Sequence, residues 1–333
     1  MTDTGTLRWG VLSTANIGRA AVNPAIQESR NGHLLAVASR TEGRARSFAD
    51  THGIPRAYGT YDALLADPEI DAVYIPLPNS LHHPWTIRAL ELGKHVLCEK
   101  PLALSAAECS AMEAASIAND RLLMEAFMYR FHPRTQALVE HMAHGSLGAL
   151  RAVRSAFTFR LTRPDNIRLS LELGGGALMD VGCYCVNVSR TIAGAEPVEV
   201  QAWANWGETG VDLELAGVLR FASGLHAHFD CALTMDRREV VEVGCTDASV
   251  LMEGAFLPGK GEVALVERRG GVASTQWHPG ADEYVRMVEH FADAALGREE
   301  LRYPASEAMR NMAVIDALYR SARGAGVAVR MDA

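Results

Sequence analysis

Residues 8–18 read RWGVLSTANIG, and they join a short apolar run to the start of a helical pattern. Arg8–Leu12 has the composition of a buried strand. The turn that follows occupies the place of the dinucleotide-binding pattern G-x-G-x-x-G but keeps only its last glycine, Gly18. Small residues there still let a backbone approach a pyrophosphate, although less freely than glycine does. An ordinary strand-to-helix turn is the alternative. The predicted nucleotide-binding turn comprises Ser13, Thr14, Ala15, Asn16 and Ile17.

The same alternation of strands and helices continues through the first third of the chain. Further apolar strands are expected at 34–38, 72–75, 95–98 and 121–124, with helices at 17–27, 42–51, 81–92 and 106–118. Short strands separated by helices of about 10–15 residues are typical of a parallel sheet with helices on both faces. The sequence therefore predicts a doubly wound, Rossmann-type first domain.

Ser39 and Arg40 follow the second strand, where NAD-specific sites usually have an acidic residue for the ribose hydroxyl. A hydroxyl and a guanidinium there suit the 2′-phosphate of NADP, because both can form charge-assisted hydrogen bonds with it. We therefore predict NADP as the cofactor, with NAD as the less favoured choice. An arginine that caps a surface turn is the alternative interpretation.

From residue 150 onward the pattern alternates between apolar and polar residues. Strands are expected at 152–161, 202–206, 213–221, 225–233, 240–243 and 249–252, and helices at 282–296 and 305–324. Such a series favours a meandering antiparallel sheet. One face should pack on a helix that begins near Gly176, and a second copy of the chain could cover the other.

The expected fold class is therefore α/β, with two domains. The first, residues 1–127, is the Rossmann domain. The second, residues 128–303, is an α/β domain with a mainly antiparallel sheet, through which copies of the chain could associate as a homodimer or homotetramer. Residues 304–333 form a helix expected to pack back on the first domain.

Two further stretches carry candidate reactive groups. Residues 97–101 read LCEKP, which places Lys100 at the end of an apolar strand. Residues 174–184 read GGGALMDVGCY, in which Asp180 and Tyr184 have the spacing that directs two side chains to one face of a helix. A lysine, an acid and a phenol can move a proton while a cofactor moves hydride between a carbonyl and an alcohol. A surface lysine and a core tyrosine are the alternatives.

Composition excludes several classes of protein. The chain has 333 residues, 48% of them hydrophobic, and a net charge of −8, which argues against a nucleic-acid surface. No apolar run approaches the roughly 20 residues of a membrane span, and the N-terminus lacks a secretory signal, so we expect a cytoplasmic protein. The six cysteines lack zinc-site spacing and are expected to be reduced thiols, with no metal site.

The ordered set of motifs resembles the glucose-fructose oxidoreductase / inositol dehydrogenase / MocA superfamily. The branch it resembles contains NADP-dependent xylose dehydrogenase, trans-dihydrodiol dehydrogenase and sugar-3-ketoreductases. Relatives outside that branch often carry histidine where this chain has Tyr184. The matching segments are WGVLSTANIG, AVASR, YIPLPNSLH, GKHVLCEKPL, MEAFMYRFHP and DNIRLSLELGGGALMDVGCY.

This resemblance implies that the Rossmann domain is followed by a substrate-binding α/β domain with a large, open, mainly antiparallel sheet. It also implies a cofactor cleft between the two domains and roles for particular residues. It implies that Lys100 lies near the nicotinamide and the reacting oxygen, often followed by a cis peptide bond to Pro101. It places Asp180 and Tyr184 in the active site, with Tyr184 as the proton donor or acceptor. The cofactor-contacting residues that it implies, besides Lys100, are Pro76, Asn79, His82, Glu99, Tyr129 and Arg130.

The polar loop before the glycine run is a candidate substrate-binding segment. We expect Asn166 and Arg168 to bind substrate hydroxyl groups together with Asp180 and Tyr184, while a solvated surface loop is the alternative. The predicted function is an NADP-linked oxidoreductase that acts on a sugar, polyol or cyclic diol. A cofactor-bound sensor without turnover, and an enzyme that keeps its nucleotide bound between two sugars, are the other hypotheses.

Overall fold

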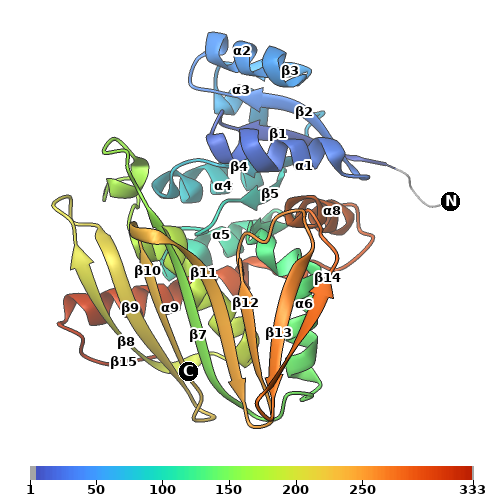
Figure 1. Cartoon of the computed structure of the whole chain (residues 1–333). Helices are drawn as coiled ribbons and strands as arrows, with labels where there is room; N and C mark the ends of the chain where they lie inside the picture. The colour runs from blue at the N-terminus through green and yellow to red at the C-terminus, as the bar shows by residue number, and fades with distance from the viewer. Residues whose placement is uncertain (1–4, 332–333) are drawn as a thin grey trace. The chain divides into compact units, whose positions relative to one another are not determined.

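The computed structural model describes residues 5–331 (Figure 1). These residues form two compact units. The first unit comprises 5–128 and 284–309, and the second comprises 129–283 and 310–331. Residues 284–309 thus group with the first unit, although they fall mostly within the expected second domain. The expected functional boundaries, and the packing of residues 304–333 on the first domain, stay predictions.

A six-stranded parallel sheet forms the centre of the first unit and confirms the predicted Rossmann-type architecture. The strand order is β3-β2-β1-β4-β5-β6. Its central strands are apolar along nearly their whole length because helices cover both faces. The strands are β1 (Leu7–Leu12), β2 (Gly32–Ala38), β3 (Arg56–Tyr58), β4 (Ala72–Ile75), β5 (His95–Cys98) and β6 (Leu123–Glu125).

The helices of the first unit follow the strands in alternation. Ser105 begins one of them by accepting a hydrogen bond from the backbone N–H of Glu108, as an N-cap residue does. Helix α8 (Glu283–Ala295) returns to this unit, where Phe291 packs 5.3 Å from the ring of Trp9 on β1. The remaining helices are η1 (Gly18–Val22), α1 (Asn23–Glu28), α2 (Glu42–His52), α3 (Tyr61–Leu65), η2 (Asn79–Leu81), α4 (His82–Glu91) and α5 (Ala106–Ala118).

A nine-stranded sheet forms the second unit, in the order β14-β13-β12-β11-β7-β10-β9-β8-β15. It is mainly antiparallel, as predicted, but it is not a simple meander, because β7 lies between β10 and β11 and pairs with β10 in parallel. The strands are β7 (Leu150–Arg160), β8 (Pro197–Trp206), β9 (Asp212–Phe221), β10 (His226–Ala232), β11 (Thr234–Cys245), β12 (Ser249–Glu253), β13 (Val263–Arg269), β14 (Val272–His278) and β15 (Val329–Arg330).

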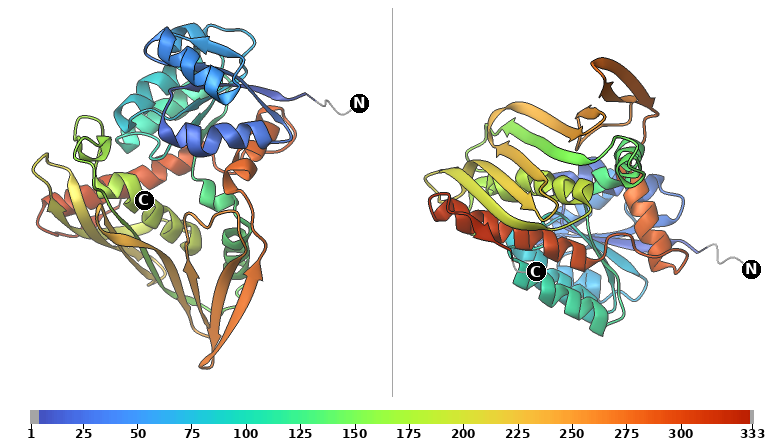
Figure 2. Two further views of the ribbon diagram at one scale, coloured as in Figure 1. Left: turned by 45° about the horizontal axis from the view of Figure 1, so that its top comes forward. Right: turned by 90° about the horizontal axis from the view of Figure 1, so that it is seen from below.

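Helices cover one face of this sheet (Figure 2). Helix α7 (Cys183–Ala193) packs on β7 and β10, as predicted for the helix after Gly176. Helix α9 (Ala305–Arg323) reaches β8, where Ser321 accepts a hydrogen bond from the backbone N–H of Ala202. The other helical segments are η3 (Met128–Phe131), α6 (Pro133–Ala143), η4 (Ile167–Leu169) and η5 (Leu178–Gly182).

No helix within residues 5–331 combines the length and apolar character needed to cross a bilayer. No disulfide joins any of the six cysteines, all of which lie in the described part of the chain.

Candidate functional site

The predicted nucleotide-binding turn lies at the carboxyl end of β1. Ser13 has a φ angle of 145°, in a region that favours glycine. The chain then enters a helical turn, in which the backbone N–H of Arg19 donates to the carbonyl of Ala15 at 3.0 Å. The first N–H groups of a helix make such a turn a favourable place for phosphate.

Gly18 lies at the start of η1, close to a buried amide. A Cβ atom at Gly18 would lie 3.3 Å from the Asn23 Oδ1 atom and 3.7 Å from the Pro76 ring. Asn23 is only 3% exposed, and neither atom of its side-chain amide has a hydrogen-bond partner within residues 5–331. An unsatisfied buried amide is costly, so this amide is a candidate group for a polar ligand.

Two arginines follow β2 in the sequence, and one of them contacts the turn. Ser39 is buried and Arg40 is exposed. Arg44, on the first turn of α2, donates from Nε to the Thr14 hydroxyl at 2.8 Å. The sequence analysis did not select Arg44, although its position four residues after Arg40 at a helix start was a usable signal. The Arg44 guanidinium is therefore held directly on the predicted nucleotide-binding turn.

The segment after β4 is tied to the turn that carries Lys100. The buried ring of His82 has Nδ1 2.9 Å from the Pro101 carbonyl oxygen and Nε2 2.8 Å from that of Leu77. Burial lowers the pKa of His82, and a neutral ring donates to one carbonyl at a time. The ring thus links two backbone segments. Asn79 begins η2 nearby in the sequence, and the contacts of Asn79 and His82 with the cofactor stay predictions.

Lys100 follows β5, and its peptide bond to Pro101 is cis, as the resemblance implied. Glu99 fixes this turn from both sides. It accepts a 2.6 Å hydrogen bond from the buried Tyr74 hydroxyl, and its other oxygen lies 3.3 Å from the backbone N–H of Lys100. Burial, with the adjacent Glu99 charge, raises the pKa of Tyr74 well above its usual value, so Tyr74 remains a donor.

In the second unit, three predicted substrate-binding residues come together. Arg168 donates from Nε to Asp180 Oδ2 at 2.5 Å, and the Asp180 side chain is only 12% exposed. Asn166 accepts the backbone N–H of Arg168 at 3.0 Å. The Arg168 guanidinium also lies 5.7 Å from the centre of the Phe159 ring. An acid, a guanidinium and an amide in one cluster offer the donors and acceptors that hydroxyl groups need.

Asp180 and Tyr184 lie on consecutive helical segments, but not on one regular α-helix. Asp180 belongs to the π-helical turn η5, which leads directly into α7 and Tyr184. A π-helical turn holds one more residue than an α-helical turn, so the predicted α-helical spacing does not apply across it. Such turns occur frequently at functional sites.

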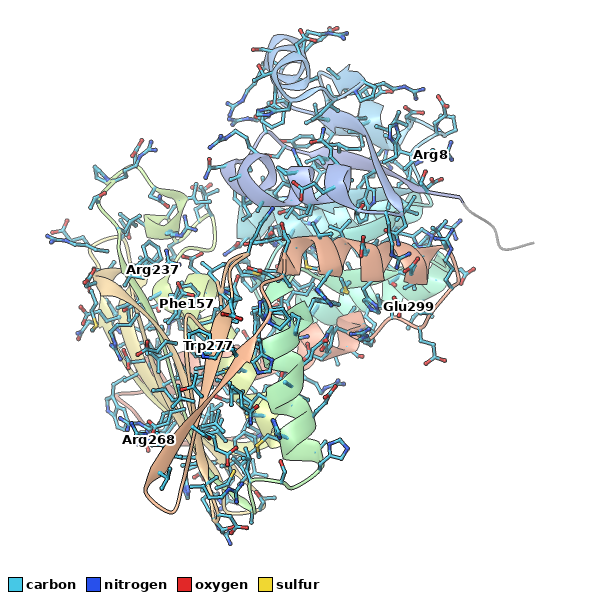
Figure 3. The ribbon with its side chains drawn as sticks, turned by 45° about the vertical axis from the view of Figure 1, so that its right-hand side comes forward. Arg8, Phe157, Arg237, Arg268, Trp277 and Glu299 are labelled. Atoms are coloured by element: carbon cyan, nitrogen blue, oxygen red, sulfur yellow. The ribbon has the colours of Figure 1, made fainter. Side chains whose placement is uncertain are left out.

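The ring of Tyr184 is packed among other aromatic rings of the second unit. Its centre lies 5.9 Å from that of Tyr129, 5.4 Å from that of Phe157 on β7 and 5.4 Å from that of Phe256. Figure 3 labels Phe157. These contacts leave Tyr184 5% exposed and fix the position of its ring.

Tyr129 and Arg130 hold α7 in place. The Tyr129 hydroxyl and Arg130 Nε donate to Asn187 Oδ1 at 2.6 and 2.7 Å, one turn beyond Tyr184. Asn187 is fully buried, and its Nδ2 lies 3.4 Å from Asn311 Oδ1. The sequence analysis missed Asn187, although a polar residue within the apolar helix CYCVNV was a signal. The predicted cofactor contacts of Tyr129 and Arg130 stay predictions.

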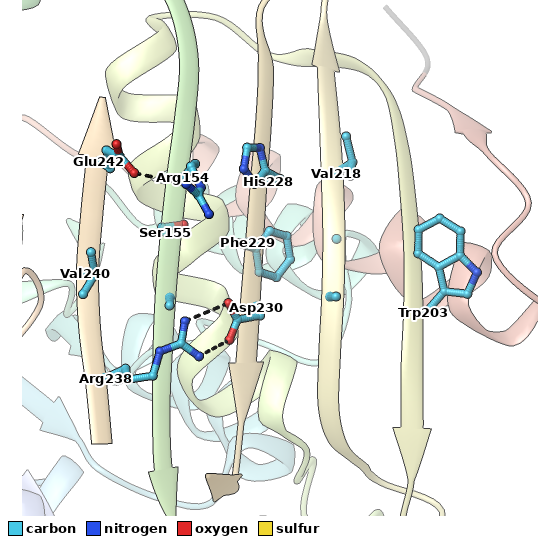
Figure 4. Close-up of a pocket in the computed structure, with 13 residues that line it drawn as sticks. Arg154, Ser155, Trp203, Val218, His228, Phe229, Asp230, Arg238, Val240 and Glu242 are labelled. Atoms are coloured by element: carbon cyan, nitrogen blue, oxygen red, sulfur yellow. Dashed lines mark hydrogen bonds and ion pairs between the residues drawn. The ribbon is translucent and has the colours of Figure 1, made fainter. Parts of the chain in front are cut away.

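The face of the large sheet opposite α7 and α9 has a hollow of about 400 Å³ (Figure 4). Trp203 borders it and is 52% exposed. Two ion pairs cross the face: Asp230 with Arg238 at 2.7 Å, and Arg154 with Glu242 at 3.4 Å. This surface therefore combines apolar area with charges of both signs.

Comparison with known families gives matches over most of the chain. Residues 7–127 match the model of an oxidoreductase family with an NAD-binding Rossmann fold. Residues 135–251 match the model of the GFO/IDH/MocA C-terminal domain.

Three similar proteins cover most of this chain. D-xylose 1-dehydrogenase (NADP(+)) 2 of Haloferax volcanii is 41% identical over 98% of this chain and 100% of its own. Bovine trans-1,2-dihydrobenzene-1,2-diol dehydrogenase is 36% identical over 72% of each chain. A 3-ketoreductase from Actinomadura kijaniata, solved with NADP and TDP-benzene, has a TM-score of 0.90 and 28% identity over 95% of this chain and 98% of its own. It has also been solved with a tyrosine-to-phenylalanine and with a lysine-to-alanine substitution.

Proposed function

Because the chain belongs to the GFO/IDH/MocA oxidoreductase family, we propose that it transfers hydride between NADP(H) and a carbon bearing a hydroxyl or carbonyl group on a sugar. The observation that carries this proposal is the cluster of Asn166, Arg168 and Asp180, because it offers hydroxyl-binding groups and its Asp180 lies four residues before Tyr184 on consecutive helical segments. The similarity to a D-xylose dehydrogenase favours an aldose. A cyclic diol is the second candidate, from the bovine relative.

The residues of the first unit fit an NADP molecule. The β1 turn offers backbone N–H groups at a helix start for the pyrophosphate. Gly18 lets this helix start pack closely against Asn23, Tyr74 and Pro76. The Ser39 hydroxyl and the Arg40 and Arg44 guanidinium groups would hold the 2′-phosphate through charge-assisted hydrogen bonds. The unsatisfied amide of Asn23 is a further polar group at this end of the sheet.

Bound NADP(H) would supply or accept the hydride. The Lys100 ammonium would stabilise negative charge on the substrate oxygen, and the Tyr184 phenol would deliver a proton in reduction or accept one in oxidation. The Arg168–Asp180 pair would orient neighbouring hydroxyl groups. A phenol with an ordinary pKa of about 10 is a poor base at neutral pH, so its action in the oxidative direction depends on a nearby cation.

The substituted forms of the Actinomadura kijaniata 3-ketoreductase support this choice of residues. Their altered lysine and tyrosine are separated by the same number of residues as Lys100 and Tyr184. That relative is 28% identical to this chain over nearly its full length.

The test is turnover with purified protein, followed by the absorbance of reduced nicotinamide. NADP+ and NAD+ are offered with D-xylose, other aldoses, polyols and a cyclic trans-diol, and NADPH is offered with the corresponding carbonyl compounds. We expect Tyr184→Phe to lower kcat by about 100-fold or more without changing NADPH affinity, since general acid–base catalysis contributes about 10²–10⁴-fold. Tyr58→Phe, a change on β3, is the control and should leave kcat unchanged.

A second prediction follows from the proposal that Lys100 and Tyr184 act on the same substrate oxygen. The effects of Lys100→Ala and Tyr184→Phe should be strongly non-additive. NADPH binding without turnover on any substrate would favour the sensor hypothesis. Unchanged turnover in Tyr184→Phe would remove that residue from the proton-transfer role.

We also propose that two copies associate through the sheet face around Trp203. A two-fold axis brings one patch against itself, so a face with charges of both signs can pair Arg154 or Arg238 of one copy with an acid of the other. The exposed Trp203 ring supplies apolar area to bury.

A further inference from the structure

A buried carboxylate in the second unit lies outside the groups used above. Asp212 opens β9 and is 1% exposed. Its Oδ2 accepts the backbone N–H of Leu178 at 2.7 Å, and its Oδ1 accepts the hydroxyl of Tyr319 on α9 at 2.7 Å. A buried carboxylate is costly unless such bonds satisfy it.

The N–H of Leu178 belongs to the first turn of the helix that carries Asp180 and Tyr184. The residue at the N-cap position is Ala177, whose side chain makes no capping hydrogen bond. Helix N-termini leave unsatisfied N–H groups and favour negative charge. Asp212 supplies both the acceptor and the charge from a distant strand.

The glycine run before this helix makes room for the carboxylate. Gly176 has a φ of 123°, and a Cβ atom there would lie 2.1 Å from Asp212 Oδ1 and 3.0 Å from the Tyr319 hydroxyl oxygen. The N–H of Gly176 donates to the carbonyl of Arg168 at 2.9 Å. Gly176 therefore connects the start of the helix to the backbone of Arg168, the residue that pairs with Asp180.

We propose that Asp212 is a positioning residue for the reaction: its carboxylate fixes the start of the helix that bears Asp180 and Tyr184, and the adjoining Arg168 loop. This proposal rests on the proposed oxidoreductase function. Asp212 is not placed in contact with the substrate. It acts through the backbone of Leu178 and the space left by Gly176.

The geometry gives this residue a pH signature. The groups that face it are the Leu178 N–H, the Tyr319 hydroxyl, the Arg323 guanidinium and the Cys231 thiol. Burial raises the pKa of Asp212 to about 6, although the hydrogen bonds favour its charged form. Below that pH one oxygen of Asp212 carries a proton and acts as a donor. The carboxyl group can then no longer accept from both the Leu178 N–H and the Tyr319 hydroxyl. The rate should therefore fall as the pH drops through about 6.

The experiment compares wild type with Asp212→Asn and Tyr319→Phe. The control is Glu214→Gln, which makes the same carboxylate-to-amide change two residues further along β9. We expect Asp212→Asn to lower kcat by about 10- to 100-fold, with NADPH affinity retained and the acidic limb of the kcat profile abolished. Tyr319→Phe removes one donor from the carboxylate, so that limb should move up by about one pH unit. Glu214→Gln should match wild type.

Hydrogen exchange of the backbone amides at residues 176–184 provides a readout that needs no turnover. These amides should exchange at least tenfold faster in Asp212→Asn than in wild type or Glu214→Gln. Unchanged exchange, or an unaltered acidic limb in both Asp212→Asn and Tyr319→Phe, would overturn the positioning role. A wild-type protein without turnover would instead refute the proposed function, and the exchange comparison would still decide the role of Asp212.

Discussion

Ser13 stands at the first position of the predicted nucleotide-binding turn, with a backbone conformation that glycine adopts more readily. Such a conformation costs a residue with a side chain about 1–3 kcal/mol. We expect Ser13→Gly to raise the free energy of unfolding by about 1 kcal/mol, since relief of strain exceeds the added chain entropy. Denaturant unfolding measures this. Ser47→Gly on α2 is the control and should lower stability by about 0.5–1 kcal/mol. A loss in both variants would contradict the strain argument.

Substitutions of Arg40 and Arg44 test whether these residues make the protein prefer NADP over NAD. A hydrogen bond to a charged group contributes about 1.5–3 kcal/mol, so Arg44→Ala or Arg40→Ala should weaken NADPH binding by about tenfold or more. NADH binding should remain unchanged, because NADH lacks the 2′-phosphate. Titration calorimetry with both nucleotides makes the comparison. Arg46→Ala, on the same helix, should leave both affinities intact. Equal weakening of NADPH and NADH would exclude a specific phosphate contact.

Among single residues, the sequence allowed candidates to be selected where the selection depends on local position. Lys100 after a strand and Asp180 after a glycine run could be selected because the strand and the helix start are local patterns. Asn187 and Asp212 could not be assigned, because their partners are distant in the chain: Asn187 bonds Tyr129, and Asp212 bonds Tyr319. A buried polar residue shows that a partner exists, but its identity requires the fold.

At the scale of elements, β5 begins with a histidine that should make stability depend on pH. His95 Nδ1 accepts the backbone N–H of Leu122 at 3.0 Å, which requires an unprotonated nitrogen. Burial, followed by the Arg121 charge, lowers the pKa of His95 to about 4, compared with about 6.5 in an unfolded chain. The unfolded state thus binds the proton more readily. The stability contributed by His95 is complete above about pH 6.5 and is lost as the pH falls towards 4.

We expect this residue to account for on the order of 2 kcal/mol of the acid-induced loss, after allowance for its partial exposure. Denaturant unfolding from pH 7 to pH 4 measures the loss in wild type and in His95→Asn. The asparagine keeps an acceptor for Leu122 but does not titrate in this range. The stability difference between the two proteins should change in that pH window by this amount, and a constant difference would refute the assignment.

Strands and helices with a clear hydrophobic pattern could be predicted from the sequence. Those whose formation depends on neighbouring elements could not. The strands from β1 to β5 have apolar runs bounded by turns, with the exception of β3, which has three residues of intermediate burial. The hairpin β13–β14 was missed because β14 is exposed along most of its length and shows no alternation. The π-helical turns η1 and η5 have no sequence pattern of their own, since each inserts one residue into an otherwise ordinary helix.

At the scale of the whole molecule, the sequence indicated that a large sheet would have one face without helices. Cross-strand neighbours on that face include Trp203 beside Ala216, and Ala216 beside Asp230. Which residues form such a row depends on register, and register becomes known only from the paired strands. A substitution at an exposed position in this row should alter association of the copies with the least effect on folding.

Ala216 is exposed at the middle of this row. We expect wild type to sediment as a dimer or tetramer at micromolar concentration and Ala216→Arg to sediment as a smaller species. A long charged side chain at the centre of a packed interface is both bulky and desolvated. Ala273→Arg, at an exposed position on β14 of the same sheet, is the matched control and should keep the wild-type mass.

The far-ultraviolet circular dichroism and the melting temperature of Ala216→Arg should resemble those of the control, apart from the stability that association itself contributes. Because mass action links that contribution to protein concentration, the melting temperature of wild type should rise with concentration, and that of Ala216→Arg should not. A wild-type monomer at micromolar concentration would refute association through this face. An Ala216→Arg protein with unchanged mass would place the interface elsewhere on the surface.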